Sequence, residues 1–500
     1  MSTSCNGRRP CLGIIAAAAG LIGIAVLTSS AAAQTPPPAA KAPDGPGKEL
    51  FTRWCSGCHG DGGAGDGFAA PYMIPRPRDL TLGNFYIRST RSGDVPTDAD
   101  LRRTISDGLP GTAMSGWKTV LSPAQIDTLV QYMKKFSPFF DGPAPAVLSP
   151  GPEPTPSAEG LSEGRRVYEQ LKCFECHGQK GRGDGTSVPT LMDDQKMPIF
   201  SADLTKNWTF RGGPTVADIY RGFRTGLNGT PMPAYTAEAN GVNDQQLWRL
   251  AQYVRSLSPA TPPDTGSVIH AVMRADGRLP ADPDDRAWDG APARYVPLGG
   301  QVAVKPRWFT PSIDGVWVQA LHDATRLAIR LTWHDPSRSP DSAFAPWLKN
   351  VVKTLDRADP PPITAQGPDR IVITFPVQIA ADSMRPHFLG GNSMRSAYVW
   401  RWSSSPDMVE EGTTRGLARF APLAARNALG HAARYRDGEW QLQFTRALLP
   451  VDSITAPRFT DQRPVPVAFF VADGSNGEIG TRGSMSGWYT IMIHMMGATQ

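Results

Sequence analysis

The spacing of hydrophobic residues changes about halfway along the chain. Apolar positions recur at helical spacing in 126–133 and again in 247–254. Beyond about residue 266 they alternate every second position, in 327–333, 439–444 and 488–493, and continuous β-rich runs fill 371–377 and 465–471. The pattern predicts two small all-α domains followed by an antiparallel β-sandwich with about seven or more strands.

Three proline-rich stretches, 35–47, 141–160 and 258–266, separate these regions. Such segments are stiff spacers that bury little surface. They predict a linker at 34–46, a first domain at 47–140, a second linker at 141–157, a second domain at 158–258 and a third domain at 266–500.

The first two domains repeat one another. Each contains a Cys-x-x-Cys-His segment, at Cys55–His59 and Cys173–His177, and each has a Gly-Asp-Gly triplet shortly after it. Both also carry a Gly-Leu-x-Gly-Thr-x-Met segment, whose methionine lies 55 residues after the histidine. The repeat is therefore a whole small domain.

The N-terminus has the pattern of a secretory signal. Arg8 and Arg9 precede an apolar run at 12–27, and small residues at 29–33 follow it. We expect cleavage near Ala33 and a periplasmic location; an uncleaved membrane anchor is the alternative.

Composition narrows the choice of partners. The signal contains two arginines and no acidic residue, so its removal lowers the formal charge from +5 to +3. No basic block predicts nucleic-acid binding, and no second apolar stretch predicts a membrane span after cleavage. Two of the six cysteines, Cys5 and Cys11, lie in the signal, so the four motif cysteines remain.

Cys-x-x-Cys-His predicts covalent c-type haem, because both thiols add to the porphyrin vinyl groups and the histidine ligates iron. The sequence therefore predicts two covalent haems. The predicted attachment and iron-ligand residues are Cys55, Cys58, His59, Cys173, Cys176 and His177. A redox dithiol or a zinc site is the alternative for such cysteines.

The sixth iron ligand decides whether substrate can reach the metal. Met114 and Met232 are the predicted ligands because they occupy the same place in the two repeats. Met73, Met192 and Met197 lie in neighbouring loops without a counterpart across the repeat and are the alternatives.

On these motifs, residues 47–140 and 158–258 resemble two class I cytochrome c domains in tandem. The resemblance implies a helical fold, electron transfer, and a haem edge partly exposed near the Cys-x-x-Cys-His face.

The third domain has short motifs of its own: 327–335, Pro386–Gly391 followed by Val399–Trp402, 435–446, and Ser486–Tyr489. With them it resembles the haem-b-binding γ subunit of ethylbenzene dehydrogenase. The resemblance implies one non-covalent b-type haem between a methionine and a lysine, but the last lysine here is Lys353. Met394 and Met485 are therefore the expected ligand pair, with His387 as an alternative.

Together these features predict an electron-transfer protein rather than an enzyme. The family resemblance implies molybdopterin and iron–sulfur subunits, or a respiratory component, as redox partners. One alternative is a c-type haem enzyme that reduces peroxide or oxidises sulfur compounds. In another, Trp400, Trp402, Trp440 and Trp488 form a stacking platform for a carbohydrate or a cell surface.

Overall fold

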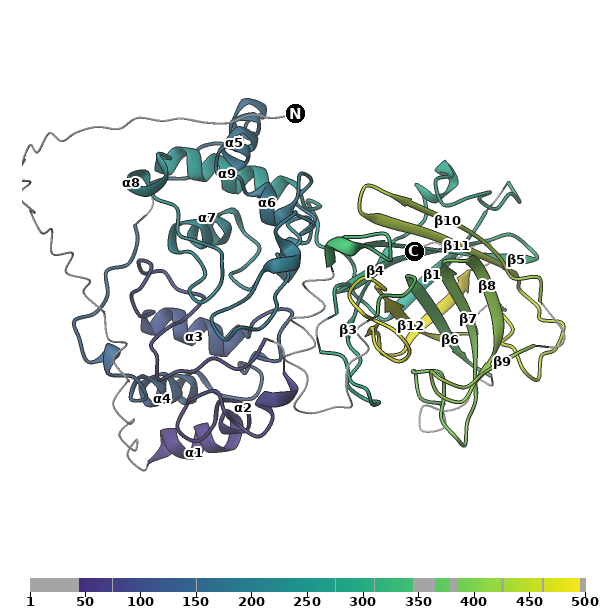
Figure 1. Ribbon diagram of the computed structural model, residues 1–500, viewed down its shortest axis with the longest axis horizontal. Helices are drawn as coiled ribbons and strands as arrows, with labels where there is room; N and C mark the ends of the chain where they lie inside the picture. The colour runs from purple at the N-terminus through teal and green to yellow at the C-terminus, as the bar shows by residue number, and fades with distance from the viewer. Residues whose placement is uncertain are drawn as a thin grey trace, which may run out of the picture. The chain divides into compact units, whose positions relative to one another are not determined.

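The computed structural model describes residues 45–494, apart from 74, 150, 275, 310, 345–364, 378–384, 424–426 and 461–462. The expected signal at 1–33, nearly all of the first linker, and Lys353 lie outside the described residues. The α-helices lie in the described chain up to residue 256, and the β-strands lie in the chain from residue 268 (Figure 1). Among the described helices, none is long and apolar enough to cross a membrane.

The two repeats contain the same succession of helices. The first has α1 (Pro46–Trp54), α2 (Ser56–His59), α3 (Asp98–Asp107) and α4 (Pro123–Lys134). The second has α5 (Ala158–Gln170), α6 (Phe174–His177), α7 (Val216–Thr225), the short α8 (Ala237–Asn240) and α9 (Asp244–Ser256). In each repeat the first helix packs against the last, α1 on α4 and α5 on α9.

Local sequence explains where these helices begin. Thr97 precedes α3 and Thr215 precedes α7, and each threonine forms a capping box with the aspartate three residues on. The hydroxyl accepts the backbone N–H of that aspartate, whose carboxylate accepts the N–H of the threonine. The equivalent cap confirms the correspondence of the repeats at the level of single hydrogen bonds.

Each repeat has its own apolar core. Leu129 and Val130 of α4 are fully buried in the first, and Leu247 and Leu250 of α9 in the second. These are the positions that the helical spacing predicts.

Arg88 joins the two repeats. Its side chain is 0% exposed, and its guanidinium donates to the backbone carbonyl of Thr225 at 2.5 Å and to Asn228 Oδ1 at 2.8 Å. A second contact pairs Arg78 with Asp194 at 2.9 Å. A buried arginine needs partners for its N–H groups. Arg88 of the first repeat finds them at the end of α7 and in the loop that follows it, and so holds the two repeats together.

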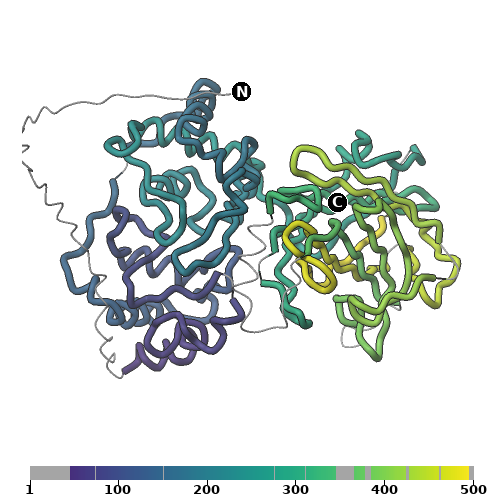
Figure 2. The backbone as a smooth tube through the Cα atoms, viewed as in Figure 1, coloured from purple at the N-terminus to yellow at the C-terminus, as the bar shows by residue number. Residues whose placement is uncertain are grey.

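From residue 268 the described chain forms β-strands, coloured from teal through green to yellow in Figure 2. Their bounds are β1 (Val268–Met273), β2 (Arg294–Pro297), β3 (Gly299–Gly300), β4 (Gly315–His322), β5 (Arg326–His334), β6 (Arg370–Pro376), β7 (Ala397–Ser404), β8 (Asp407–Thr414), β9 (Phe420–Pro422), β10 (Gly430–Arg436), β11 (Glu439–Ala447), β12 (Val465–Ala472), β13 (Ser484–Met485) and β14 (Tyr489–His494).

The strands are hydrogen-bonded in the order β10-β11-β5-β4-β1-β14-β12-β6-β7-β8-β9. Most neighbours are antiparallel, as predicted, but β1 runs parallel to both β14 and β4, so the sheet is mixed. Strand β12 joins the two parts of this path, since Val465–Val467 pair with β14 and 468–472 pair with β6. Alternation within a strand does not reveal its neighbour's direction, which explains the difference.

Aromatic side chains fill the core of the β-rich half. Trp333 and Trp440, on β5 and β11, contact Trp402 of β7 with ring centroids 6.2 and 4.9 Å apart. Trp400, Trp402 and Trp440 are at most 4% exposed. A stacking platform needs exposed rings. These three tryptophans are buried and therefore cannot form the platform of the carbohydrate-binding alternative.

Candidate functional site

The two Cys-x-x-Cys-His segments adopt the same local structure. Each lies on a single helical turn, α2 or α6, at the end of the first helix of its repeat. Burial raises the pKa of Cys55 to about 12, with a smaller contribution from Cys58, and burial also raises the pKa of Cys173 to about 12. A redox dithiol requires a thiol with a lowered pKa, so these surroundings disfavour that alternative.

Both histidines are oriented by a backbone carbonyl. His59 Nδ1 donates to the carbonyl of Arg78 at 3.1 Å, and His177 Nδ1 donates to that of Ala202 at 2.9 Å. Burial lowers the pKa of each imidazole, which favours the neutral ring. With the proton on Nδ1, the Nε2 lone pair of each ring is available to a metal.

Glycines allow the chain to turn directly after each histidine. Gly60 has φ 74° and ψ 158°, and Gly178 has φ 78° and ψ 164°, a region that only glycine adopts readily. A Cβ at either position would also collide with the carboxylate of the aspartate in the Gly-Asp-Gly triplet, Asp66 or Asp184. The shared glycines are therefore a backbone requirement of this turn.

The methionine loops are also equivalent. The backbone N–H of Met114 donates to Thr112 Oγ1 at 3.1 Å, and that of Met232 donates to Thr230 Oγ1 at 3.2 Å. Met114 and Cys55 both pack against the apolar core of the first repeat, and Met232 and Cys173 both pack against that of the second. Each predicted methionine ligand thus shares an apolar core with the first cysteine of its own attachment motif.

A cavity of about 1020 Å³ surrounds the second motif. Cys173, Cys176, His177 and Met232 line it together, so the structure brings the four predicted residues of this repeat to one space. Its lining continues to residues 110–113, next to Met114 in the first repeat. The methionine loop of one repeat therefore borders the cavity of the other.

Two buried hydrogen-bond donors on the cavity wall indicate whether the cavity suits a haem. Neither Trp208 Nε1 nor Tyr295 Oη has a hydrogen-bond partner among the described residues, although both atoms are buried. Buried donors normally bond to something, and a propionate carboxylate would accept from both. The thiols, the imidazole, the thioether and these donors together fit a c-type haem.

The alternative methionines have other surroundings. Met197 is 5% exposed, its backbone N–H donates to Asp193, and neither it nor Met192 lines the cavity. Met73 caps the 3-10 turn Ala70–Tyr72.

The residues expected to bind a b-type haem differ in their exposure and in the side chains that they contact. The Met394 side chain is 89% exposed, whereas Met485 of β13 is half-buried and packs against the cluster of Leu389 and Phe470. His387 and Trp488 line a cavity of about 430 Å³, and His387 Nδ1 accepts the Leu389 N–H. That hydrogen bond leaves the proton of a neutral His387 on Nε2.

A charged cluster that the motifs did not predict joins the second repeat to the β-rich half. Lys206 is 4% exposed and its ammonium pairs with Asp203 at 3.2 Å and Asp314 at 2.6 Å. His334 of β5 also contacts Asp203, at 2.5 Å. Burial alone would lower the pKa of Lys206, but the facing carboxylates of Asp314 and Asp203 raise it, so the ammonium stays charged.

A repeated triplet could have pointed to this cluster. Asp-Leu-Thr occurs at 79–81 and 203–205, and each aspartate accepts hydrogen bonds from its own threonine. The next residue is Leu82 in the first repeat, 46% exposed, and Lys206 in the second. A lysine in place of leucine is the signal that the second repeat has a polar neighbour.

Comparison with known proteins supports the repeats. Residues 42–133 match the family described as cytochrome C oxidase, cbb3-type, subunit III, and residues 161–258 match the family described as cytochrome c.

Three relatives overlap with part of the chain. A protein of Haloferax mediterranei named respiratory nitrate reductase heme subunit ORF7 is 27% identical over 44% of this chain and 70% of its own length. The cbb3-type cytochrome c oxidase subunit CcoP of Rhodobacter capsulatus is 26% identical over 42% of this chain. The matched part covers 61% of the length of that relative.

A solved chain of the Kuenenia stuttgartiensis reducing HAO-like protein complex Kustc0457/Kustc0458 is 39% identical, with a TM-score of 0.41, over 44% of this chain and 99% of its own. Together with the paired attachment motifs, the two family matches and the first two relatives support a multihaem c-type cytochrome.

Proposed function

We propose that this protein is an exported electron carrier with two covalent haems, which passes electrons between a respiratory oxidoreductase and the electron-transport chain from the periplasm. Bound haem iron supplies one-electron exchange between the ferric and ferrous states. The chain attaches each haem through two cysteines, orients one histidine and presents one methionine.

One observation carries this proposal: a thioether, an imidazole and two thiols converge on a single cavity in the second repeat, with equivalent residues in the first. A methionine opposite the histidine would leave no open iron position for substrate. This arrangement favours electron transfer over the alternative, a peroxidase or sulfur-compound oxidoreductase. The continuity of the cavity lining with residues 110–113 supports electron exchange between the two sites.

The names of the two relatives support a proposal for the redox partner. The relatives are named as subunits of a nitrate reductase and of a cbb3-type oxidase, which supports a respiratory redox partner for this chain. A molybdopterin enzyme with an iron–sulfur subunit is the partner class that the γ-subunit resemblance of residues 266–500 implies.

The covalent haem count tests the proposal. After acid–acetone extraction, we expect the alkaline pyridine spectrum of the purified protein to give about two c-type haems per chain, one for each motif. Changing Cys173 and Cys176 to serine should lower the count to about one. A count near one in the unmodified protein would overturn the two-haem proposal.

A non-covalent b-type haem between Met394 and Met485 is a separate part of the proposal. Because Met394 is 89% exposed, a haem bound there would have to cover its side chain. We expect acid–acetone to extract about one haem per chain from protein made with ample haem, since this haem has no thioether bond. Replacing Met485 with alanine should abolish that fraction, whereas the Met408→Ala control, at an exposed position of β8, should retain it. If the extract of the unmodified protein contains no haem, the b-type haem proposal is wrong and the protein carries only its covalent haems.

A further inference from the structure

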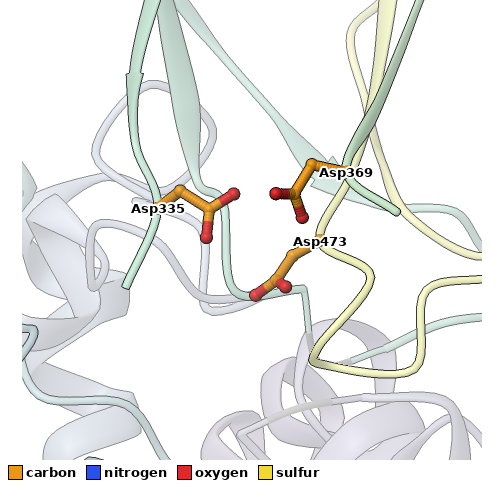
Figure 3. Close-up of side chains that lie close together, drawn as sticks. All are labelled: Asp335, Asp369 and Asp473. Carbon is orange, nitrogen blue, oxygen red and sulfur yellow. The ribbon is translucent and has the colours of Figure 1, made fainter. Parts of the chain in front are cut away.

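Three aspartates meet at the ends of strands in the β-rich half. Asp335 directly follows β5, Asp369 directly precedes β6, and Asp473 directly follows β12. All three are 0% exposed, and one carboxylate oxygen of each lies within 4.8 Å of those of the other two. Figure 3 shows the three carboxylates directed toward a common centre.

Among the residues that the structure describes, no basic side chain forms an ion pair with these carboxyl groups. The groups that donate hydrogen bonds to the three carboxyl groups are neutral hydroxyl, indole and backbone N–H groups. Asp369 accepts from Trp440 Nε1 at 3.1 Å and from the Ser339 N–H at 3.0 Å. Asp473 accepts from Ser312 Oγ at 2.6 Å and from the Ser475 N–H at 2.9 Å. Buried carboxylates are ordinarily paired with a cation or coordinate a metal.

Two buried oxygen atoms at the cluster lack a hydrogen-bond partner in the described part of the chain, which is a second observation that points to a ligand. Asp335 Oδ1 is within 3.1 Å of the Ser337 N–H, but Asp335 Oδ2 has no hydrogen-bond partner among the described residues. Ser337 Oγ, whose residue is 2% exposed, likewise has none there. Fully buried oxygen atoms without a partner are rare and indicate a missing group.

The donor set defines the class of that group. The converging ligand atoms are carboxylate oxygens, which hard cations prefer. Ca²⁺ takes six to eight oxygen ligands at roughly 2.3–2.6 Å, so one ion can contact three oxygens within this spacing. Mg²⁺ usually keeps several of its waters, which a site with no solvent exposure does not favour.

We propose that Asp335, Asp369 and Asp473 bind one structural calcium ion. The ion joins the end of β5 to the adjacent strands β6 and β12. Asp335 also follows His334, which contacts Asp203 of the second cytochrome repeat. Calcium therefore stabilises the part of the β-rich half that faces this repeat, whether or not the protein carries electrons as proposed.

The experiment uses the full haem-loaded chain, stripped with EGTA and then dialysed against calcium chloride or magnesium chloride. We expect elemental analysis to find about one calcium per chain. At a calcium concentration of about 100 times Kd, the unfolding midpoint followed by tryptophan fluorescence should rise by roughly 5 °C or more. Magnesium at the same concentration should have little effect.

Two isosteric variants localise the ion, and a third serves as the control. Asp335→Asn and Asp369→Asn should lose both the bound calcium and the shift, while Asp276→Asn, at an exposed aspartate of the same half, should keep both. Because the stripped and loaded unmodified chains are compared directly, a variant that fails to fold does not decide the result. A chain that binds no calcium and shows no shift would overturn the proposal, as would calcium binding that persists in both cluster variants.

Discussion

Replacing Met232 with alanine is expected to lower the reduction potential of the second haem and to remove its weak near-infrared methionine-to-iron band. Thioether sulfur favours ferrous iron, so its loss stabilises the ferric state. Axial ligands tune haem potentials over a range of about 0.8 V, and we expect a decrease on the order of 0.1 V or more. Spectroelectrochemical titration measures it, and Met114→Ala should affect the first haem in the same way.

Met197→Ala is the matched control. Met197 is buried in the same repeat but does not line the cavity, so its loss should leave both the band and the potential unchanged. The ligand assignment would fail if Met232→Ala behaved like Met197→Ala. It would move to Met197 if the two results were exchanged.

Replacing Lys206 with leucine should destabilise the protein by about 3 kcal/mol, at the lower end of the range for removing one partner of a buried ion pair. The cost arises mainly at Asp203, whose side chain is 9% exposed; Asp314 is 53% exposed and can be hydrated. Guanidinium unfolding, followed by tryptophan fluorescence and by haem absorbance, measures the change.

An exposed pair between the same two parts of the chain provides the control. Lys180 and Asp437 are 2.8 Å apart with side chains 57% and 58% exposed, so Lys180→Leu should cost less than about 1 kcal/mol. Adding Asp203→Asn to Lys206→Leu should recover part of the loss, since it removes the buried negative charge that has lost its lysine. Equal effects of Lys206→Leu and Lys180→Leu would show that burial does not strengthen the Lys206 pair.

The sequence predicted local structure better than it predicted contacts between distant segments. Alternation predicted β5 and β11, and helical spacing predicted α4 and α9, because these periods follow from one element and the face it buries. The equivalent positions of the two repeats could be matched because the repeat supplied an internal comparison, whereas their role as haem ligands stays a prediction. Hydrophobic spacing describes a single segment, and the repeat compares two copies of a segment, so neither shows which distant segments meet.

The acidic cluster could not be predicted in this way, and for the Lys206 cluster the repeat draws attention to the lysine but does not identify its partners. Asp369 and Asp473 become neighbours only because β6 pairs with β12, and Asp335 joins them from another strand of the sheet. Similarly, no pattern near His334 identifies Asp203 as its partner. Such sites depend on strand order, and strand order depends on pairings between segments far apart in the chain.

The parallel pairing of β1 with β14 constrains the order in which the protein can mature. Val268–Val272 pair with Thr490–His494, so the first strand of the β-rich half has its neighbour in the last described one. During synthesis from the N-terminus, both cysteine motifs emerge well before residues 489–494. In the function proposed above, haem can therefore be attached at Cys55–His59 and Cys173–His177 while the sheet still lacks β14, its central strand. The cytochrome repeats can be loaded with cofactor before the β-rich half closes beside the second of them.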